Sequence, residues 1–144
     1  MYKIEKREWG FYLTFGGVIS EDEMAAWLEE SRERLADAEA PFYVFVDMRS
    51  MIPLNPQAQV FMQEGQKHFR AQGMERSVVI LSSPVVAAQF KRIGGETGIG
   101  RYERYIDATA VENWEDIGML WLLQGIDPDE IRSEIKTGPL FTKS

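Results

Sequence analysis

Residues Phe42-Tyr43-Val44-Phe45-Val46 and Val78-Val79-Ile80-Leu81 decide the fold class of this chain. Both are short, continuous apolar runs, which are typical of strands buried on both faces of a parallel sheet. A polar residue followed by proline comes after each run, Asn55-Pro56 and Ser83-Pro84, and this pair predicts a helix cap and the first helical residue. The alternation predicts an α/β fold in which helices connect the strands of a mostly parallel sheet.

The sequence on either side extends this unit. Alternating apolar residues predict an antiparallel pair of strands at 2–7 and 11–16. Ser20 and Glu23 predict a capping box at the start of a helix that stops at Ala40-Pro41. The expected order is β-β-α-β-α-β-α-β-α, which forms a mixed, mostly parallel sheet with a short C-terminal helical tail. The further elements are helices at 56–72, from Pro84 and at 110–124, and a strand at 104–106. Gly94-Gly95 and Gly98-Ile99-Gly100 are expected to terminate the helix that begins at Pro84.

Composition limits the classes of protein to which this chain can belong. It has 144 residues, 44% of them hydrophobic, which suits one globular domain. It has no cysteine, so disulfides, zinc–thiolate sites and thiol catalysis are excluded. The N-terminus lacks the apolar core of a signal peptide, and the longest apolar stretch, 117–123, is too short to span a membrane. We expect a cytoplasmic protein that is not membrane-spanning.

The charge of the chain is negative and unevenly distributed. A net charge of −7 makes nucleic acid an unfavourable partner. Residues 20–40 hold eight acidic and two basic residues, whereas residues 67–105 hold seven basic and three acidic ones. The acidic segment is either the solvated face of one helix or half of a complementary pair of surfaces, and the second reading favours self-association.

Several short segments resemble the STAS fold of bacterial anti-sigma-factor antagonists, and more closely the SpoIIAA-like family of stand-alone bacterial proteins, also described as STAS/Sec14-like. The resemblance covers roughly residues 2–128, which we take as the domain 1–128, followed by a tail at 129–144. The segments that carry it are Phe45-Val46-Asp47-Met48-Arg49, residues 73–80, Ser82-Ser83-Pro84-Val85, Tyr105-Ile106-Asp107-Ala108 and residues 121–128.

This resemblance implies a regulatory or ligand-binding module that is not an enzyme and needs no cofactor or metal. In the anti-sigma antagonists a kinase phosphorylates a serine at the start of the helix after the central strand. The corresponding residues here, 54–58, contain no serine or threonine, and Ser50 lies earlier in the chain. The phosphoswitch is therefore not carried over to this sequence.

Candidate binding residues gather where the predicted strands end. Ligands of open α/β sheets bind outside the carboxyl ends of the strands, which is where Asp47 and Arg49 fall. The starts of helices are predicted at Asn55, Ser83 and Thr109, the last with Glu112 as a capping box. Each start is either an ordinary cap or part of an anion site, because helix N-termini present N–H groups and partial positive charge.

The basic residues and the single histidine give weaker signals. Residues 94–100 are rich in glycine but lack the lysine and the preceding strand of a phosphate-binding loop. Arg92 and Arg101 flank this segment, together with Lys91, and are candidates for contact with an acidic partner. His68 is interpreted as structural, with ligand contact or catalysis beside Asp47 as the alternatives.

Two apolar segments predict an interaction surface. Residues 47–54 are expected to form a loop that contains Met51, and Met side chains adapt to irregular apolar partners. The loop either folds over its own core or exposes a binding groove. Residues 117–123 are apolar on every side, so the helix at 110–124 needs a cover on both sides. Either the tail helix provides it through Ile126, Ile131 and Ile135, or a second subunit does.

Together these features favour a non-enzymatic STAS/SpoIIAA-like module that binds a protein partner, with a possible homodimer through residues 110–124. The alternative is a carrier or sensor of a small hydrophobic, lipid-like ligand. The carrier predicts a continuous apolar pocket, whereas the partner-binding module predicts a filled core and an exposed apolar patch.

Overall fold

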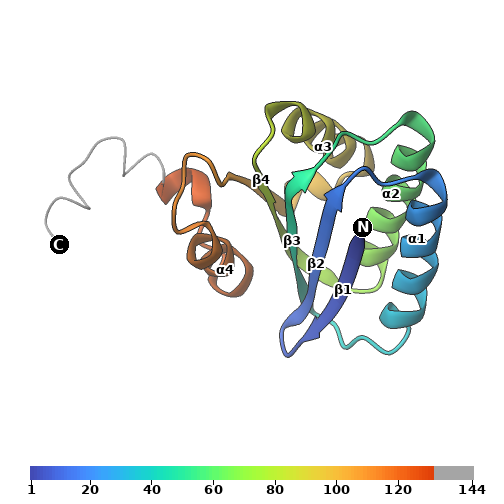
Figure 1. Cartoon of the computed structure of the whole chain (residues 1–144). Coiled ribbons are helices and arrows are strands. Elements are labelled where there is room, and N and C mark those ends of the chain that lie inside the picture. Colours follow the sequence, from blue (N-terminus) through green and yellow to red (C-terminus); the bar gives the residue numbers. More distant parts are fainter. Residues whose placement is uncertain (132–144) are drawn as a thin grey trace, which may run out of the picture.

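A five-stranded mixed sheet forms the centre of the protein in the computed structural model, which describes residues 1–131 (Figure 1). The strands lie side by side in the order in which they occur in the sequence. β1 is antiparallel to β2, and all later neighbours are parallel, as the sequence predicts. The strands are β1 (Tyr2–Arg7), β2 (Gly10–Gly17), β3 (Phe42–Met51), β4 (Met74–Leu81) and β5 (Glu103–Asp107).

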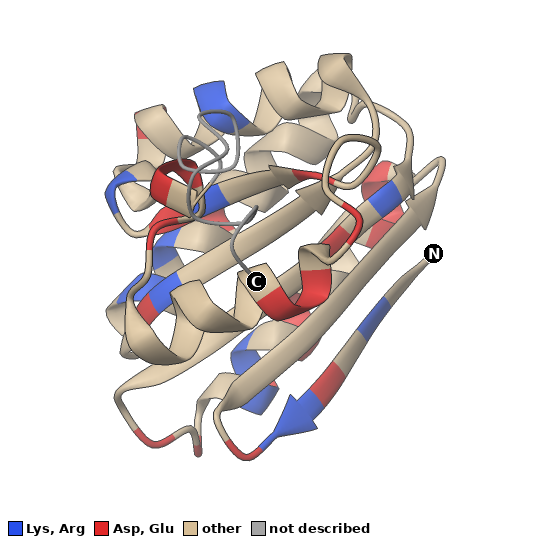
Figure 2. Ribbon diagram, turned by 90° about the vertical axis from the view of Figure 1, so that its left-hand side faces the viewer, with Lys and Arg blue, Asp and Glu red and all other residues tan. Residues whose placement is uncertain are grey.

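Helices cover the two faces of this sheet unequally. Figure 1 shows α1 (Glu21–Leu35), α2 (Pro56–Ala71) and α3 (Pro84–Thr97) on one face, and α4 (Trp114–Gln124) on the other. α4 contacts β3, β4 and β5, and Trp9 and Tyr12 extend the core beneath it toward β2. Figure 2 looks onto this side, where basic and acidic residues alternate along β1.

Side-chain caps fix the starts of the first three helices, as predicted. The Ser20 Oγ accepts a hydrogen bond from the Glu23 N–H at 3.1 Å. The Asn55 Oδ1 accepts from the backbone of residue 58 at 2.9 Å, and the Ser83 Oγ accepts from residue 86 at 3.3 Å. These bonds satisfy N–H groups that have no partner within the helix.

The continuous apolar runs fill two cores, one on each face of the sheet. Val44 and Val46 point into the core beneath α1, α2 and α3, whereas Phe45 points into the core beneath α4. Because successive side chains of a strand point to opposite faces, a strand buried on both faces must be apolar at every position. This geometry confirms the interpretation of the sequence runs.

Three predicted element boundaries are wrong. The first is the end of α1, which lies at Leu35 and not at Ala40-Pro41. Residues 47–51 are not loop but the end of β3, because Gly16 and Gly17 of β2 continue to pair with Ser50 and Met51. α3 runs past Gly94-Gly95 to Thr97 and is capped at Gly98, which belongs to the second glycine segment predicted to terminate it. A Cβ on Gly94 would lie 2.6 Å from the Tyr105 hydroxyl, so this glycine permits close packing and does not end the helix.

The third wrong boundary is the start of α4. No capping box forms at Thr109, since α4 begins at Trp114 after residue 113, which makes no side-chain cap. The Thr109 backbone N–H and hydroxyl donate to the Asp107 Oδ1 at 2.9 and 2.6 Å, which holds a turn after β5. Asp and Thr side chains favour such local turns over a helix. Of the residues expected to cover this helix, Ile131 packs against the core beneath α4, Ile126 is 38% exposed, and Ile135 lies outside the described residues.

Candidate functional site

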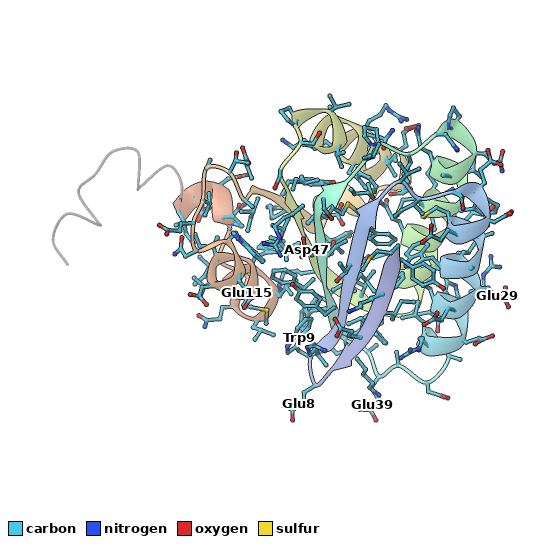
Figure 3. The ribbon with its side chains drawn as sticks, in the orientation of Figure 1. Glu8, Trp9, Glu29, Glu39, Asp47 and Glu115 are labelled. Atoms are coloured by element: carbon cyan, nitrogen blue, oxygen red, sulfur yellow. The ribbon has the colours of Figure 1, made fainter. Side chains whose placement is uncertain are left out.

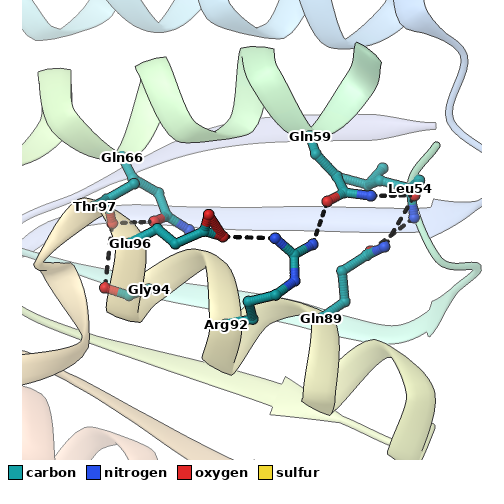
Figure 4. A network of polar contacts seen from close by, with 8 residues as sticks. All are labelled: Leu54, Gln59, Gln66, Gln89, Arg92, Gly94, Glu96 and Thr97. Atoms are coloured by element: carbon teal, nitrogen blue, oxygen red, sulfur yellow. Dashed lines mark hydrogen bonds and ion pairs between the residues drawn. The ribbon is translucent and has the colours of Figure 1, made fainter. Parts of the chain in front are cut away.

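The loops at the carboxyl end of the sheet are joined into one surface. The Ile52 N–H donates to the Gly17 carbonyl at 3.0 Å, which ties the loop after β3 to the end of β2. The Leu54 N–H donates to the Gln89 Oε1 at 2.8 Å, and the Gln89 Nε2 donates to the Leu54 carbonyl at 2.9 Å (Figure 4). Gln59 of α2 also donates to this carbonyl. The loop that leads from β3 into α2 is therefore held against the starts of both α2 and α3.

Exposed apolar side chains concentrate on this surface. Seven large hydrophobic side chains are exposed among residues 1–131. Five of them belong to segments at the carboxyl end of the sheet, whereas Leu123 and Ile126 lie at the end of α4. Scattered exposed apolar residues are ordinary, but a concentration at one end of a sheet marks an interaction site. We call these five residues the apolar patch: Met1, Val18, Ile52, Val60 and Val85, exposed by 49%, 72%, 49%, 42% and 64%.

Asp47 and Arg49 pair with each other at the end of β3. The Arg49 Nε and Nη2 donate to the two Asp47 carboxylate oxygens at 3.0 and 2.9 Å. The Arg49 guanidinium also lies 4.2 Å from the centroid of the Trp114 ring. Hydrogen bonding to Asp47 raises the pKa of Arg49, opposed by desolvation. Figure 3 places Asp47 on the side of the sheet that faces α4, so the pair links β3 to α4.

The other predicted binding residues are dispersed. Asn55 and Ser83 cap α2 and α3. Met51 is 4% exposed and belongs to the core, so the structure favours the interpretation that this segment folds over its own core. Arg92 donates to Glu96 at 2.6 Å on α3 and also to Gln59, as Figure 4 shows. Arg101 lies in the 3₁₀ turn η1 (Ile99–Arg101), on the exposed side.

His68 and Asp47 do not form a catalytic pair. His68 lies on α2, on the face of the sheet opposite to Arg49 and Trp114, with which Asp47 is associated. No group of three or more His, Cys, Asp or Glu side chains within residues 1–131 could hold a metal ion. The described helices include none that is long and apolar enough to cross a membrane.

A buried polar cluster surrounds Glu103, which the sequence analysis did not single out. The Ser77 hydroxyl donates to the Glu103 Oε2 at 2.8 Å, and the Tyr105 hydroxyl lies 2.7 Å from the Glu103 Oε1. Tyr105 also lies 3.2 Å from the Phe90 carbonyl, although its hydroxyl has one proton to donate. Desolvation raises the pKa of Glu103, against the hydrogen bonds from Tyr105 and Ser77.

The core beside Glu103 contains only a small cavity. This cavity measures about 30 Å³ and lies between the sheet and the helices α1 to α3, where Trp27, Gln66 and Glu103 contribute to its lining. Such a volume is on the order of one water molecule. The filled core is what a partner-binding module requires, and it offers no room for a lipid chain.

The fold is that of a SpoIIAA-like, STAS-type α/β domain, which confirms the resemblance found in the sequence. No family model matches the chain, and no curated protein matches it. A similar crystal structure is that of an uncharacterized protein of the DUF3478 family with a SpoIIAA-like fold, from Shewanella loihica PV-4. The two chains are 18% identical with a TM-score of 0.56, and the match covers 85% of this chain and 92% of that chain. At this identity the likeness concerns the fold alone.

Proposed function

We propose that this protein is a STAS-type binding module that holds a protein partner on the apolar patch, without the phosphoswitch serine of the anti-sigma antagonists. The observation that carries the proposal is the concentration of five exposed apolar side chains at the carboxyl end of the sheet. This end is where open α/β sheets place their binding sites. Burial of such side chains by a partner removes apolar surface from water, which drives association.

The residues at the start of α2 support a module without that switch. Asn55 occupies the cap position, and its side chain already accepts the backbone hydrogen bond of residue 58. Ser50 lies in β3, before the helix begins. Control by phosphorylation at this helix start is therefore not part of the proposal.

The two alternative assemblies have less support. A lipid-like ligand would need more than the cavity of about 30 Å³ in the core. A dimer through residues 110–124 would use Leu123, which is 48% exposed, whereas the opposite side of α4 is buried on the sheet. The end of α4 carries only two of the exposed apolar side chains among residues 1–131, so it serves as the comparison surface in the test.

The test is an affinity capture with two double variants. Val18→Asp with Ile52→Asp introduces charge into the apolar patch, and Leu123→Asp with Ile126→Asp makes the same change at the end of α4. We expect the unmodified protein and the α4 variant to retain the same partner from an extract of the source cells, and the patch variant to lose it. Quantitative mass spectrometry of the captured proteins gives the readout. Retention by the patch variant, or equal loss from both variants, would contradict the proposal.

A further inference from the structure

Acidic side chains border the apolar patch on the α1 side. The cap residue Ser20 is followed by Glu21 and Asp22, which are both exposed and both lie in the first turn of α1. They line a shallow, open depression of the surface together with Val18 and Asn55, which we call the cleft. The cleft therefore places two carboxylates beside Val18, the most exposed apolar side chain of the patch.

The positive charges of this region already have partners. The Met1 ammonium lies 3.1 Å from Glu23, and Arg92 is paired with Glu96 at 2.6 Å. Within the described part of the chain, no basic side chain makes an ion pair with Glu21 or Asp22. The favourable interaction of these acids with the helix N-terminus explains their presence on α1, and it leaves their outer oxygens in water.

We infer that the partner binds through a cationic amphipathic segment, whose apolar side chains lie on the patch and whose lysine or arginine side chains enter the cleft at Glu21 and Asp22. This inference rests on the proposed function and adds the chemistry of the partner. An apolar surface with an acidic border is complementary to an apolar segment with basic residues on its flank. An anionic lipid surface would instead be repelled by the two carboxylates.

The first experiment uses two synthetic helical peptides and the isotope-labelled protein. One peptide has leucine along one face and lysine beside it, and the matched peptide has glutamate in place of each lysine. We expect the lysine peptide to shift the backbone amide NMR signals of Val18, Ile52 and Val85, and the glutamate peptide to leave them unchanged. Equal shifts with both peptides would overturn the inference.

A charge-matched pair of variants separates the cleft from the net charge. Glu21→Lys with Asp22→Lys should weaken binding of the lysine peptide about tenfold, because two exposed ion pairs are replaced by repulsion. Glu29→Lys with Glu33→Lys makes the same change of net charge on exposed positions farther along α1, and Figure 3 shows Glu29 pointing away from the domain. Equal weakening by both variants would overturn the inference, because net charge alone would then explain the binding.

The same variants, applied to the captured natural partner, distinguish failure of the inference from failure of the proposed function. Loss of that partner with the patch variant but not with Glu21→Lys and Asp22→Lys would refute the cationic segment and leave the patch as the binding site. If both the patch variant and the variant with Glu21→Lys and Asp22→Lys retained that partner, the inference and the proposed function would both be refuted. Binding of the unmodified protein to phosphatidylglycerol vesicles through Val18 and Ile52 would also overturn the inference, and so would capture of a second copy of this chain.

Discussion

The two faces of the sheet differ in the side-chain contacts that attach the helices to them. The face beneath α1, α2 and α3 is closed by packed rings, with Trp27 stacked on Phe69 at a centroid distance of 6.0 Å. The face beneath α4 has an apolar core as well, but guanidinium groups lie over rings at its margin, with Arg49 and Arg104 each 4.2 Å from the centroid of a tryptophan ring. Dense apolar packing tolerates little added volume, whereas one helix held at its margins can shift. This difference predicts that the same substitution lowers the free energy of unfolding by different amounts on the two faces.

The largest effect is expected from Gly65→Ala between α1 and α2. A Cβ at Gly65 would lie 2.2 Å from two ring atoms of Trp27, which is itself held between Phe15 and Phe69. Overpacking of this kind costs about 2 kcal/mol even after the gain in helix propensity. Urea unfolding followed by circular dichroism measures the change in the free energy of unfolding.

Gly95→Ala is the matched control. Gly95 lies in α3, is exposed, and would place a Cβ in open space. The alanine should therefore stabilise the protein by about 0.5–1 kcal/mol. If Gly65→Ala were neutral, Trp27 would have room to move, and the contrast between a rigid and an adjustable face would be lost.

Gly118→Ala makes the same test on the face beneath α4. A Cβ at Gly118 would lie 2.7 Å from a ring atom of Phe45 and 3.3 Å from Val78. Only α4 and a single helical turn at residues 128–131 cover this face among the described residues, so α4 can shift outward, and we expect a loss of about 1 kcal/mol. The same urea unfolding measurement applies. A cost equal to or above that of Gly65→Ala would show that the face beneath α4 is the more rigid one.

Glu103→Gln tests a buried carboxyl on the face beneath α1 to α3. Because burial raises the pKa of Glu103 in the folded state, the folded protein holds a proton that the unfolded chain releases at lower pH. The contribution of Glu103 to the free energy of unfolding is therefore fully present below the pKa of the unfolded chain. It is lost as the pH rises from that value through the raised pKa of the folded protein. The glutamine side chain does not titrate, so the variant should lose less stability than the unmodified protein as the pH rises. Unfolding in urea at a series of pH values measures this, and parallel curves for the two proteins would mean that Glu103 is ionised in the fold.

The sequence predicts the fold better than the site. The apolar runs, the caps at Ser20, Asn55 and Ser83, and the antiparallel first strand follow from local chemistry and hold in the structure. The extension of β3 could not be predicted, because it depends on pairing between Ser50 and a β2 residue far away in sequence.

The candidate site shows the same limit. Asp47 and Arg49 are two residues apart, and residues at this spacing on a strand point to the same face. Their pairing could therefore be predicted from the sequence if residues 47–51 were recognised as strand. The apolar patch was not predictable, because its residues come from the chain start, two loops and two helices, and only the folded sheet brings these segments to one end.

The smallest effect should come from Arg49→Lys, which alters the contacts of residue 49 with Asp47 and with Trp114 of α4. Lysine cannot make the two parallel hydrogen bonds to Asp47 and stacks less well on Trp114, but the Arg49 side chain is 45% exposed. We therefore expect a loss of about 0.5–1 kcal/mol in the free energy of unfolding. Arg32→Lys is the control, since Arg32 lies 3.6 Å from Glu64 with both side chains about half exposed, and its effect should fall within about 0.3 kcal/mol of zero. Equal values for the two variants would place the Arg49 pair among ordinary surface ion pairs, and α4 would then be held by its apolar contacts and by the hydrogen bonds of Trp121 and Leu122 to β4.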